Sequence, residues 1–148
     1  MTINFAKYNF RIKKERESQF IFDIIRKKFV ALTPEEWVRQ HWIHYLIDEA
    51  KFPRSLIAVE MNIMVNDLSK RCDIVVYNRE GKPFLIVECK SPDIKISQKV
   101  FDQIARYNLT LQVKYLIVSN GKQHFACEID FEKRKYAFIE KTPAFLSD

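Results

Sequence analysis

The chain has 148 residues, of which 47% are apolar and 30% are charged. This size and composition are typical of one soluble globular domain spanning residues 1–148, with enough apolar side chains for a hydrophobic core. No apolar run is as long as a membrane span and the N-terminus lacks a signal-peptide pattern, so we expect a cytoplasmic protein without membrane contact. The formal net charge of +6 favours a polyanionic partner, although many basic proteins bind no nucleic acid.

Residues 1–32 are expected to form an N-terminal extension built on a β-hairpin, with a polar turn at residues 14–18. Arg26, Lys27 and Lys28 follow the second strand of this hairpin. The basic trio could contact a phosphate backbone, or it could be a solvated turn, which is the commoner case for a short run of charge.

Residues 33–140 are expected to form the core, which begins with a helix that runs to about Ala50. Thr33 is a favourable N-cap, Pro34 suits the first helical position, and Glu36 stands where a capping box places its acid. Glu36 therefore has two interpretations that the sequence alone leaves open. It is either the capping partner of Thr33 or a carboxylate that reaches a site.

Charged residues interrupt two apolar strands that follow this helix. A first long strand is expected over residues 56–65, followed by a polar turn over residues 66–71. A β-hairpin comes next, with Asp73 at the start of one strand and Glu88 and Lys90 near the end of the other. Side chains alternate along a strand, so Glu88 and Lys90 point to one side while Cys89 points to the other. Burying an unpaired charge is costly, so these charges suggest a functional site.

Antiparallel pairing of the two hairpin strands would bring Asp73 beside Glu88. Two carboxylates and the backbone carbonyl of Cys89 would make an oxygen-only site of the kind that Mg²⁺ prefers. Lys90, held beside them, could stabilise a developing negative charge or orient a water. These are the groups that phosphodiester hydrolysis needs.

A second helix is expected from the N-cap Ser97 to about Gln112, with Gln103 and Tyr107 stacked on one face at i, i+4. Three further strands complete the chain, over residues 114–119, 124–129 and 135–140, with a turn at Asn120 and Gly121 between the first two. The predicted fold class is α/β (α+β), a mixed sheet with helices packed against it.

The spacing of Asp73, Glu88, Lys90, Gln103 and Tyr107 resembles the PD-(D/E)XK nuclease superfamily. The Asp…Glu-X-Lys motif followed by Gln-x-x-x-Tyr is similar in particular to the branch with RecB-type nucleases and the N-terminal endonuclease domain of type I restriction enzyme R proteins. The stretch from residue 26 to residue 41 also resembles the R proteins. Cys72 stands where the name of the motif has Pro.

This resemblance implies a restriction-endonuclease-like αβββαβ core and a Mg²⁺-dependent nuclease acting on DNA, most simply an endonuclease. It implies a metal, Mg²⁺ with Mn²⁺ as a substitute, held by Asp73, Glu88 and the Cys89 carbonyl. Lys90 would lie near the attacked phosphate, and Glu36 would complete the acidic cluster. The DNA-facing side would carry Gln103 and Tyr107, with Gln40, Arg26, Lys27 and Lys28 as further candidates.

The chain departs from an R protein in one respect, since it contains no Walker sequence and therefore no ATP-driven motor of its own. A separately encoded helicase or specificity subunit is then a candidate partner, and a homodimer is another. An alternative function is a catalytically weak or inactive nucleic-acid-binding module of the same fold. The third interpretation is a purely structural salt-bridge cluster. The sequence leaves the choice among DNA, RNA and branched substrates open, as well as endo- or exonuclease action.

Overall fold

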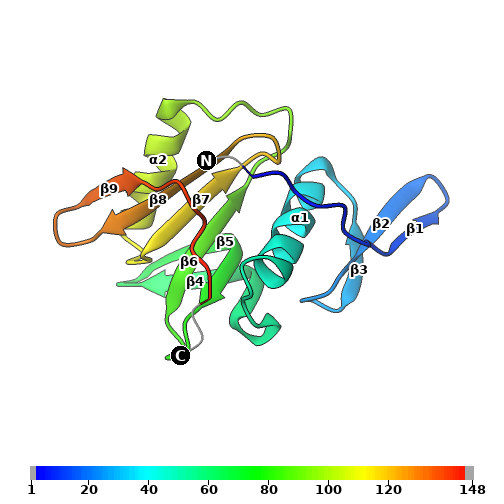
Figure 1. Cartoon of the computed structure of the whole chain (residues 1–148), viewed down its shortest axis with the longest axis horizontal. Coiled ribbons are helices and arrows are strands. Elements are labelled where there is room, and N and C mark those ends of the chain that lie inside the picture. Colours follow the sequence, from blue (N-terminus) through cyan, green and yellow to red (C-terminus); the bar gives the residue numbers. More distant parts are fainter. Residues whose placement is uncertain (1–2, 146–148) are drawn as a thin grey trace.

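The computed structural model describes residues 3–145, which form two helices, a three-stranded sheet and a six-stranded sheet (Figure 1). The N-terminal sheet is antiparallel, in the order β1 (Ile12–Glu15), β2 (Ser18–Asp23) and β3 (Lys28–Ala31). The main sheet has the order β4 (Ile57–Val65), β5 (Leu68–Tyr77), β6 (Pro83–Cys89), β7 (Tyr115–Ser119), β8 (His124–Asp130) and β9 (Lys135–Phe138). The helices are α1 (Pro34–Asp48) and α2 (Gln98–Leu109), and a short 3₁₀ turn, η1 (Arg54–Leu56), precedes β4.

The main sheet is mixed, because β6 and β7 are parallel while every other neighbouring pair is antiparallel. Parallel neighbours need a crossover, and α2 supplies it between β6 and β7. The order α1, β4, β5, β6, α2, β7 is the αβββαβ order expected from the sequence. The predicted mixed α/β architecture is therefore confirmed.

The two helices cover opposite faces of the main sheet, as two separate apolar clusters show. On one face, Trp42 and Leu46 of α1 pack with Val87 and other residues of the central strands. On the other face, Phe101 and Ala105 of α2 pack against a second set of strand side chains. Each strand of the central hairpin is thus buried on both sides, which explains its nearly continuous Val and Ile content.

Helix α1 lies between the two sheets (Figure 1), so its far side is covered as well. This double cover buries polar residues of the helix, among them Glu36, Arg39 and Gln40. The predicted N-cap is confirmed, since the Glu36 backbone N–H donates to Thr33 Oγ1 at 3.0 Å. The Thr33 N–H, however, donates to the Ala31 carbonyl rather than to Glu36, so the capping box is not completed.

Two elements differ from those predicted from the sequence. The N-terminal extension is a three-stranded sheet and not a hairpin, because β3 returns to pair with β2 after a turn at residues 24–27. The polar stretch expected as a turn over residues 66–71 is mostly strand. The turn consists of Asn66 and Asp67, both with positive φ as in a tight two-residue hairpin loop. Strand β5 begins directly after it, at Leu68.

The later elements agree with the sequence analysis. Ser97 caps α2 by accepting the Val100 N–H at 3.2 Å, and β7, β8 and β9 follow as expected. Cys72, Cys89 and Cys127 are buried free thiols. No helix in residues 3–145 is both long and apolar enough to cross a membrane.

Candidate active site

Asp73 lies within β5 rather than at its start, at a point where the strand is distorted. The regular alternation of faces breaks there, because Cys72 and Val75 both pack on the α2 side while Ile74 packs on the α1 side. On the neighbouring strand, Glu60 has φ +54°, a backbone conformation unusual for a side chain other than glycine. The distortion turns the Asp73 carboxylate towards α1.

The Asp73 carboxylate joins three parts of the fold. Its Oδ1 accepts a hydrogen bond from Arg39 Nη2 of α1 at 2.9 Å, and its Oδ2 accepts the backbone N–H of Cys89 at 2.7 Å. The β5–β6 pairing thus brings Asp73 against the segment Glu88-Cys89-Lys90. The Cys89 side chain points into the apolar cluster under α1, as expected from strand alternation.

Glu88 is paired with a lysine that the sequence analysis placed in a turn. The Glu88 side chain is 11% exposed, and Lys70 Nζ lies 2.6 Å from its Oε1 in an ion pair. Lys70 Nζ also lies 5.0 Å from the ring centre of Tyr107 on α2. Glu88, Lys70 and Tyr107 therefore form one cluster on the α2 side of the sheet. Gln103 is exposed on the same helix.

Lys90 directly follows β6, and its backbone N–H donates to the carbonyl of Ser119 at 2.7 Å. The positive charge of Lys90 acts on the pKa of Glu35, which lies in the first turn of α1. Burial and the neighbouring Asp73 raise the pKa of Glu35, and the positive charges of Arg39 and Lys90 oppose that rise. Glu35, Asp73 and Lys90 thus share one electrostatic environment.

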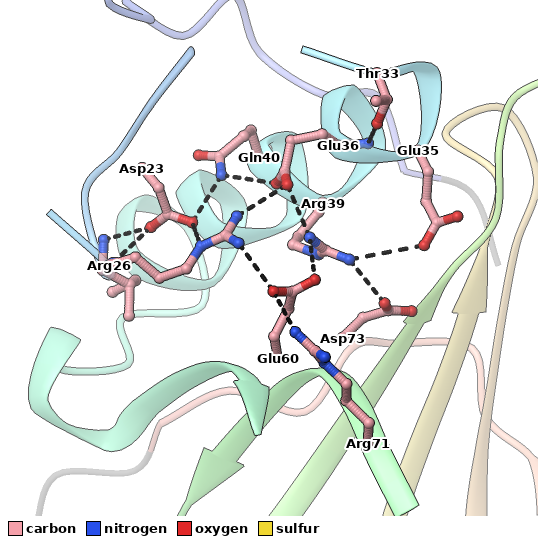
Figure 2. A network of polar contacts seen from close by, with 11 residues as sticks. Asp23, Arg26, Thr33, Glu35, Glu36, Arg39, Gln40, Glu60, Arg71 and Asp73 are labelled. Carbon is pink, nitrogen blue, oxygen red and sulfur yellow. Dashed lines mark hydrogen bonds and ion pairs between the residues drawn. The ribbon is translucent and has the colours of Figure 1, made fainter. Parts of the chain in front are cut away.

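Glu35, not Glu36, is the α1 carboxylate on the Asp73 side. Figure 2 shows the Arg39 guanidinium between two pairs of acids. Its Nη2 lies 2.9 Å from Asp73 and 3.7 Å from Glu35, whereas its Nη1 lies 2.8 Å from Glu36 and 3.5 Å from Glu60. Glu36 lies at Nη1 of Arg39, and Asp73 and Glu35 lie at Nη2. Glu35 is therefore a second candidate acid on α1, beside the Glu36 that the sequence analysis selected.

Glu36 belongs to a buried network that ties the N-terminal sheet to α1 (Figure 2). Arg26 donates to Asp23 at 2.7 Å and to Glu36 at 2.9 Å, and Gln40 Nε2 donates to both of those acids at 2.9 and 3.1 Å. Burial raises the pKa of Asp23, but hydrogen bonds from the Arg26 backbone and side chain and from Gln40 outweigh it and hold the pKa below its ordinary value.

This network changes the interpretation of two candidate nucleic-acid contacts. Gln40 is fully buried, so it cannot touch DNA and its prediction was wrong. The Arg26 side chain is 15% exposed and is engaged by three carboxylates, so its charge is already balanced within the protein. Lys27 and Lys28 are exposed, as a phosphate contact would require, and their role stays a prediction.

The network as a whole is short of positive charge. Three arginines, Arg26, Arg39 and Arg71, face five carboxylates, those of Asp23, Glu35, Glu36, Glu60 and Asp73. Burial would lower the pKa of Arg39, but Glu36 and Asp73 raise it above its usual value, so the guanidinium is firmly charged. The formal charge of −2 is that of a site able to attract a divalent cation.

The donor atoms fit Mg²⁺ in kind but are not gathered around one point. Asp73, Glu88 and the Cys89 carbonyl are oxygen donors, which Mg²⁺ prefers. Within residues 3–145, however, no group of three or more His, Cys, Asp or Glu side chains is arranged as a ready metal site. Arg39 and Lys70 instead neutralise the two acids. A metal held by these residues would have to displace or rearrange those two cations.

Sequence reasoning missed Lys70, Arg39 and Glu35. Lys70 was not recognised as a site residue, because the stretch from Leu68 to Arg71 is polar enough to resemble a loop. Glu35 could have been recognised by helix geometry, since neighbouring residues on a helix point about 100° apart and only one can face the strands. The position of that face depends on the N-terminal sheet, which the sequence showed only in part.

Comparisons with known proteins agree with this architecture. A search of curated proteins finds no match. Among solved structures, a fragment described as an HsdR subunit of a type I restriction enzyme from Vibrio vulnificus YJ016 shares the fold, with a TM-score of 0.52 and 18% identity. The similarity covers 76% of this chain and 24% of that one. The family model for the type I restriction enzyme R protein N terminus (HSDR_N) matches residues 34–143. The chain therefore belongs to the family of type I restriction enzyme R protein N-terminal domains.

Proposed function

We propose that this domain is a Mg²⁺-dependent nuclease with a restriction-endonuclease-like core, which hydrolyses phosphodiester bonds in DNA. One observation carries the proposal: the Asp73 carboxylate accepts the Cys89 N–H at 2.7 Å. This bond fixes Asp73 against the Glu88-Cys89-Lys90 segment and places an acid, a backbone carbonyl and a lysine at one end of a parallel strand pair. In α/β sheets, ligands bind at the carboxyl ends of strands.

Asp73, Glu88 and the Cys89 carbonyl are the proposed metal ligands, and Glu35 replaces Glu36 as the assisting carboxylate of α1. A bound Mg²⁺ would supply Lewis-acid polarisation of the phosphate and a more acidic water. Mn²⁺ has the same preference for oxygen ligands and is expected to substitute.

The chain's own side chains bind and orient the substrate. Lys90 would place a positive charge where negative charge develops on the attacked phosphate. Gln103 and Tyr107 are exposed on α2, on the side where Lys70 and Glu88 lie, and would contact the DNA there.

The experiment that tests this proposal is a Mg²⁺ and Mn²⁺ titration by calorimetry, with the wild type beside Asp73→Ala. Duplex, single-stranded and branched DNA and RNA are then assayed for cleavage with Lys90→Ala and with Lys82→Ala, a matched control at an exposed lysine in the turn between β5 and β6. We expect metal binding that Asp73→Ala abolishes, and cleavage that Lys90→Ala abolishes and Lys82→Ala leaves unchanged. Equal weak heats for both proteins, with and without DNA, would contradict the proposal.

The second candidate function is a nucleic-acid-binding module of the same fold with little or no turnover. Its support is the pairing of Asp73 with Arg39 and of Glu88 with Lys70, which balances both acids without a metal. The two functions separate in one assay, because a binding module would retain DNA affinity in Asp73→Ala and show no metal-dependent product in the wild type.

The partners of the domain follow from its family. The chain spans 24% of the Vibrio vulnificus fragment that it matches, so a DNA-translocating helicase and a specificity subunit would be contributed by other polypeptides or segments. A homodimer would be the alternative way to present two sites to two DNA strands. Sedimentation of the domain alone and with DNA distinguishes these arrangements.

A further inference from the structure

The N-terminal sheet lies outside the residues that match the family model, which begin at residue 34. It also carries most of the excess charge of the protein. Residues 3–31 contain eight Lys and Arg against three acids, a formal charge of +5 in a chain whose total is +6. The family therefore assigns no role to the most basic segment of the molecule.

One face of this sheet is already buried. Ile21 and Asp23 of β2 are fully buried, and Asp23 accepts a hydrogen bond from Gln40 of α1, so this face packs on the helix. Side chains at alternate positions of a strand point to opposite faces. Phe20 and Phe22 of β2 therefore point outwards, away from α1.

The outward face carries an aromatic surface that folding alone does not require. Phe20 pairs in register with Ala31 of β3, and Phe22 pairs with Phe29, whose ring centre lies 5.3 Å away. The sheet needs one apolar face to pack on α1, and the opposite face already supplies it. Three half-buried phenylalanine rings on the solvent side of a small sheet are the feature that needs an explanation.

Two cations of β1 and its entry lie directly over these rings. The Arg11 guanidinium is 4.5 Å from the Phe22 ring centre and 5.5 Å from that of Phe29. Lys13 Nζ is 4.5 Å from the Phe29 ring centre and 5.8 Å from that of Phe20. Lys13 also lies 2.9 Å from Glu15, but an exposed ion pair of this kind is weak and easily exchanged.

We propose that this outward face binds an unpaired DNA strand. Arg11 and Lys13 would move from the rings to the phosphates, and Phe20, Phe22 and Phe29 would stack on the bases. Proteins that hold single strands combine aromatic stacking platforms with a positively charged path for the backbone. The bases of a duplex are already stacked on one another, so individual rings, of which Phe22 and Phe29 lie at 73° to each other, discriminate in favour of unpaired bases. The inference rests on the proposed function in taking DNA as the substrate, and it makes a single-stranded segment the preferred form.

A chain of ion pairs connects the sheet to the candidate active site. Arg26, in the turn between β2 and β3, contacts Glu36 and Glu60, and both of these acids contact Arg39, which holds Asp73. A strand held on the sheet would therefore have a fixed position relative to Asp73.

The test is fluorescence anisotropy with a labelled oligothymidylate of about 15 nucleotides, a length within the usual range of single-strand sites. A duplex of equal length is measured beside it, and EDTA is present so that no cleavage occurs. The variants are Phe22→Leu/Phe29→Leu, which keeps apolar side chains but removes the rings, and Arg11→Gln/Lys13→Gln. Lys133→Gln/Lys135→Gln is the matched control at the far end of the main sheet.

We expect the wild type to bind the single strand more tightly than the duplex. Phe22→Leu/Phe29→Leu should weaken strand binding about tenfold or more, because two stacking contacts are lost. For Arg11→Gln/Lys13→Gln, the slope of log K for strand binding against the log of salt concentration should become less steep by about 1.4. Each phosphate contact on a single strand contributes roughly 0.7 to that slope. The control should change neither quantity.

Ala31→Glu provides a test that leaves every ring in place, in case the leucine variant fails to fold. Ala31 is exposed and pairs with Phe20, so the new carboxylate would stand on the same face and repel a phosphate backbone. Binding as tight as the wild type in a folded Ala31→Glu protein would overturn the inference. Equal or tighter binding of the duplex by the wild type would overturn it too.

The inference and the proposed function fail in different ways. Asp73→Ala should bind the labelled strand as the wild type does, since Asp73 is not part of the aromatic face. Suppose that Phe22→Leu/Phe29→Leu and Arg11→Gln/Lys13→Gln lose strand binding and the wild type shows no metal-dependent cleavage of any substrate. The inference would then stand and the nuclease proposal would be rejected. If these folded variants bind the strand normally and still cleave DNA, the nuclease proposal would stand and the inference would be rejected.

Discussion

Two groups of acids on α1 and its surroundings differ in how firmly they are held. Asp23 and Glu36 lie at the junction with the N-terminal sheet, where both are buried and each accepts several hydrogen bonds. Glu35 and Asp73 lie on the other side of Arg39, where Glu35 is about half exposed and has only a 3.7 Å contact. The first group is suited to hold the fold together. In the second group the Cys89 N–H fixes Asp73, and Glu35 is the acid that is free to exchange partners.

The difference teaches that neighbouring residues with the same chemistry can have opposite roles. Glu35 and Glu36 are adjacent, and Arg39 touches both. The N-terminal sheet makes the distinction, because Arg26 reaches Glu36 and leaves Glu35 to the side of Asp73. The following predictions test this contrast, beginning with the largest expected effect.

Asp23→Ala should destabilise the domain by about 3 kcal/mol or more, because it removes a buried carboxylate that accepts four hydrogen bonds. These come from the backbone N–H groups of Ile25 and Arg26, from the Arg26 side chain and from Gln40. Asp130→Ala is the matched control. Asp130 also stands at the end of a strand and accepts the backbone N–H three residues on, but it is exposed. Urea unfolding should show a loss below about 1 kcal/mol for the control. Equal losses would mean that the junction is not the firm part of the structure.

Glu36→Gln and Glu35→Gln should separate stability from metal binding. Glu36→Gln removes a charge that two buried guanidinium groups share and should cost about 2 kcal/mol of stability. Glu35→Gln should alter stability by less than about 0.5 kcal/mol, as for most exposed positions, yet weaken Mn²⁺ binding. Calorimetry and urea unfolding on both variants provide the check. The reverse pattern would restore Glu36 as the site acid.

Arg39→Gln should strengthen divalent-ion binding while it lowers stability, because it removes the cation that now neutralises Asp73. A gain of about tenfold in Mg²⁺ affinity corresponds to about 1.4 kcal/mol, a reasonable value for one partly buried charge. Arg71→Gln is the control, since Arg71 contacts Glu60 but not Asp73 and is largely exposed. Unchanged or weaker affinity in Arg39→Gln would show that the arginine supports the metal site instead of competing with it.

The sequence was sufficient for the features that local chemistry determines. Thr33 and Ser97 are helix caps because their hydroxyls satisfy free N–H groups, and they function so here. The apolar hairpin brought Asp73 to the Glu88 segment because strands with two buried faces must pair with each other. These parts depend on contacts between neighbours in the chain or on one strand pair.

The remaining features depend on long-range packing, and for that reason sequence patterns missed them. Arg26 belongs to a basic trio, yet two of its three acidic partners are 10 and 34 residues away. The sequence pattern placed Lys70 in a polar turn. In the structure the turn is limited to residues 66 and 67, so Lys70 lies in a strand beside Glu88. The choice between Glu35 and Glu36 required knowing which sheet covers each side of α1.

The smallest predicted effect is a pH dependence of opposite sign at Asp23 and Glu35. The pKa of Asp23 is lowered in the folded protein, so its stabilising contribution is present above the unfolded value of about 4 and is lost as pH falls through the lower folded value. The pKa of Glu35 is raised by burial and by Asp73, so its contribution is complete below about 4.5 and is lost as pH rises through the folded value.

Glu35→Gln should therefore gain stability relative to the wild type as pH rises from about 4 to 7, by a few tenths of a kcal/mol because this side chain is half exposed. Asp23→Asn should show the reverse trend, with a penalty that shrinks as pH falls below about 4. Urea midpoints of the three proteins at several pH values measure both slopes. Parallel slopes for the two variants would mean that Asp23 and Glu35 have equivalent surroundings, and the contrast between the firm junction and the exchangeable site would fail.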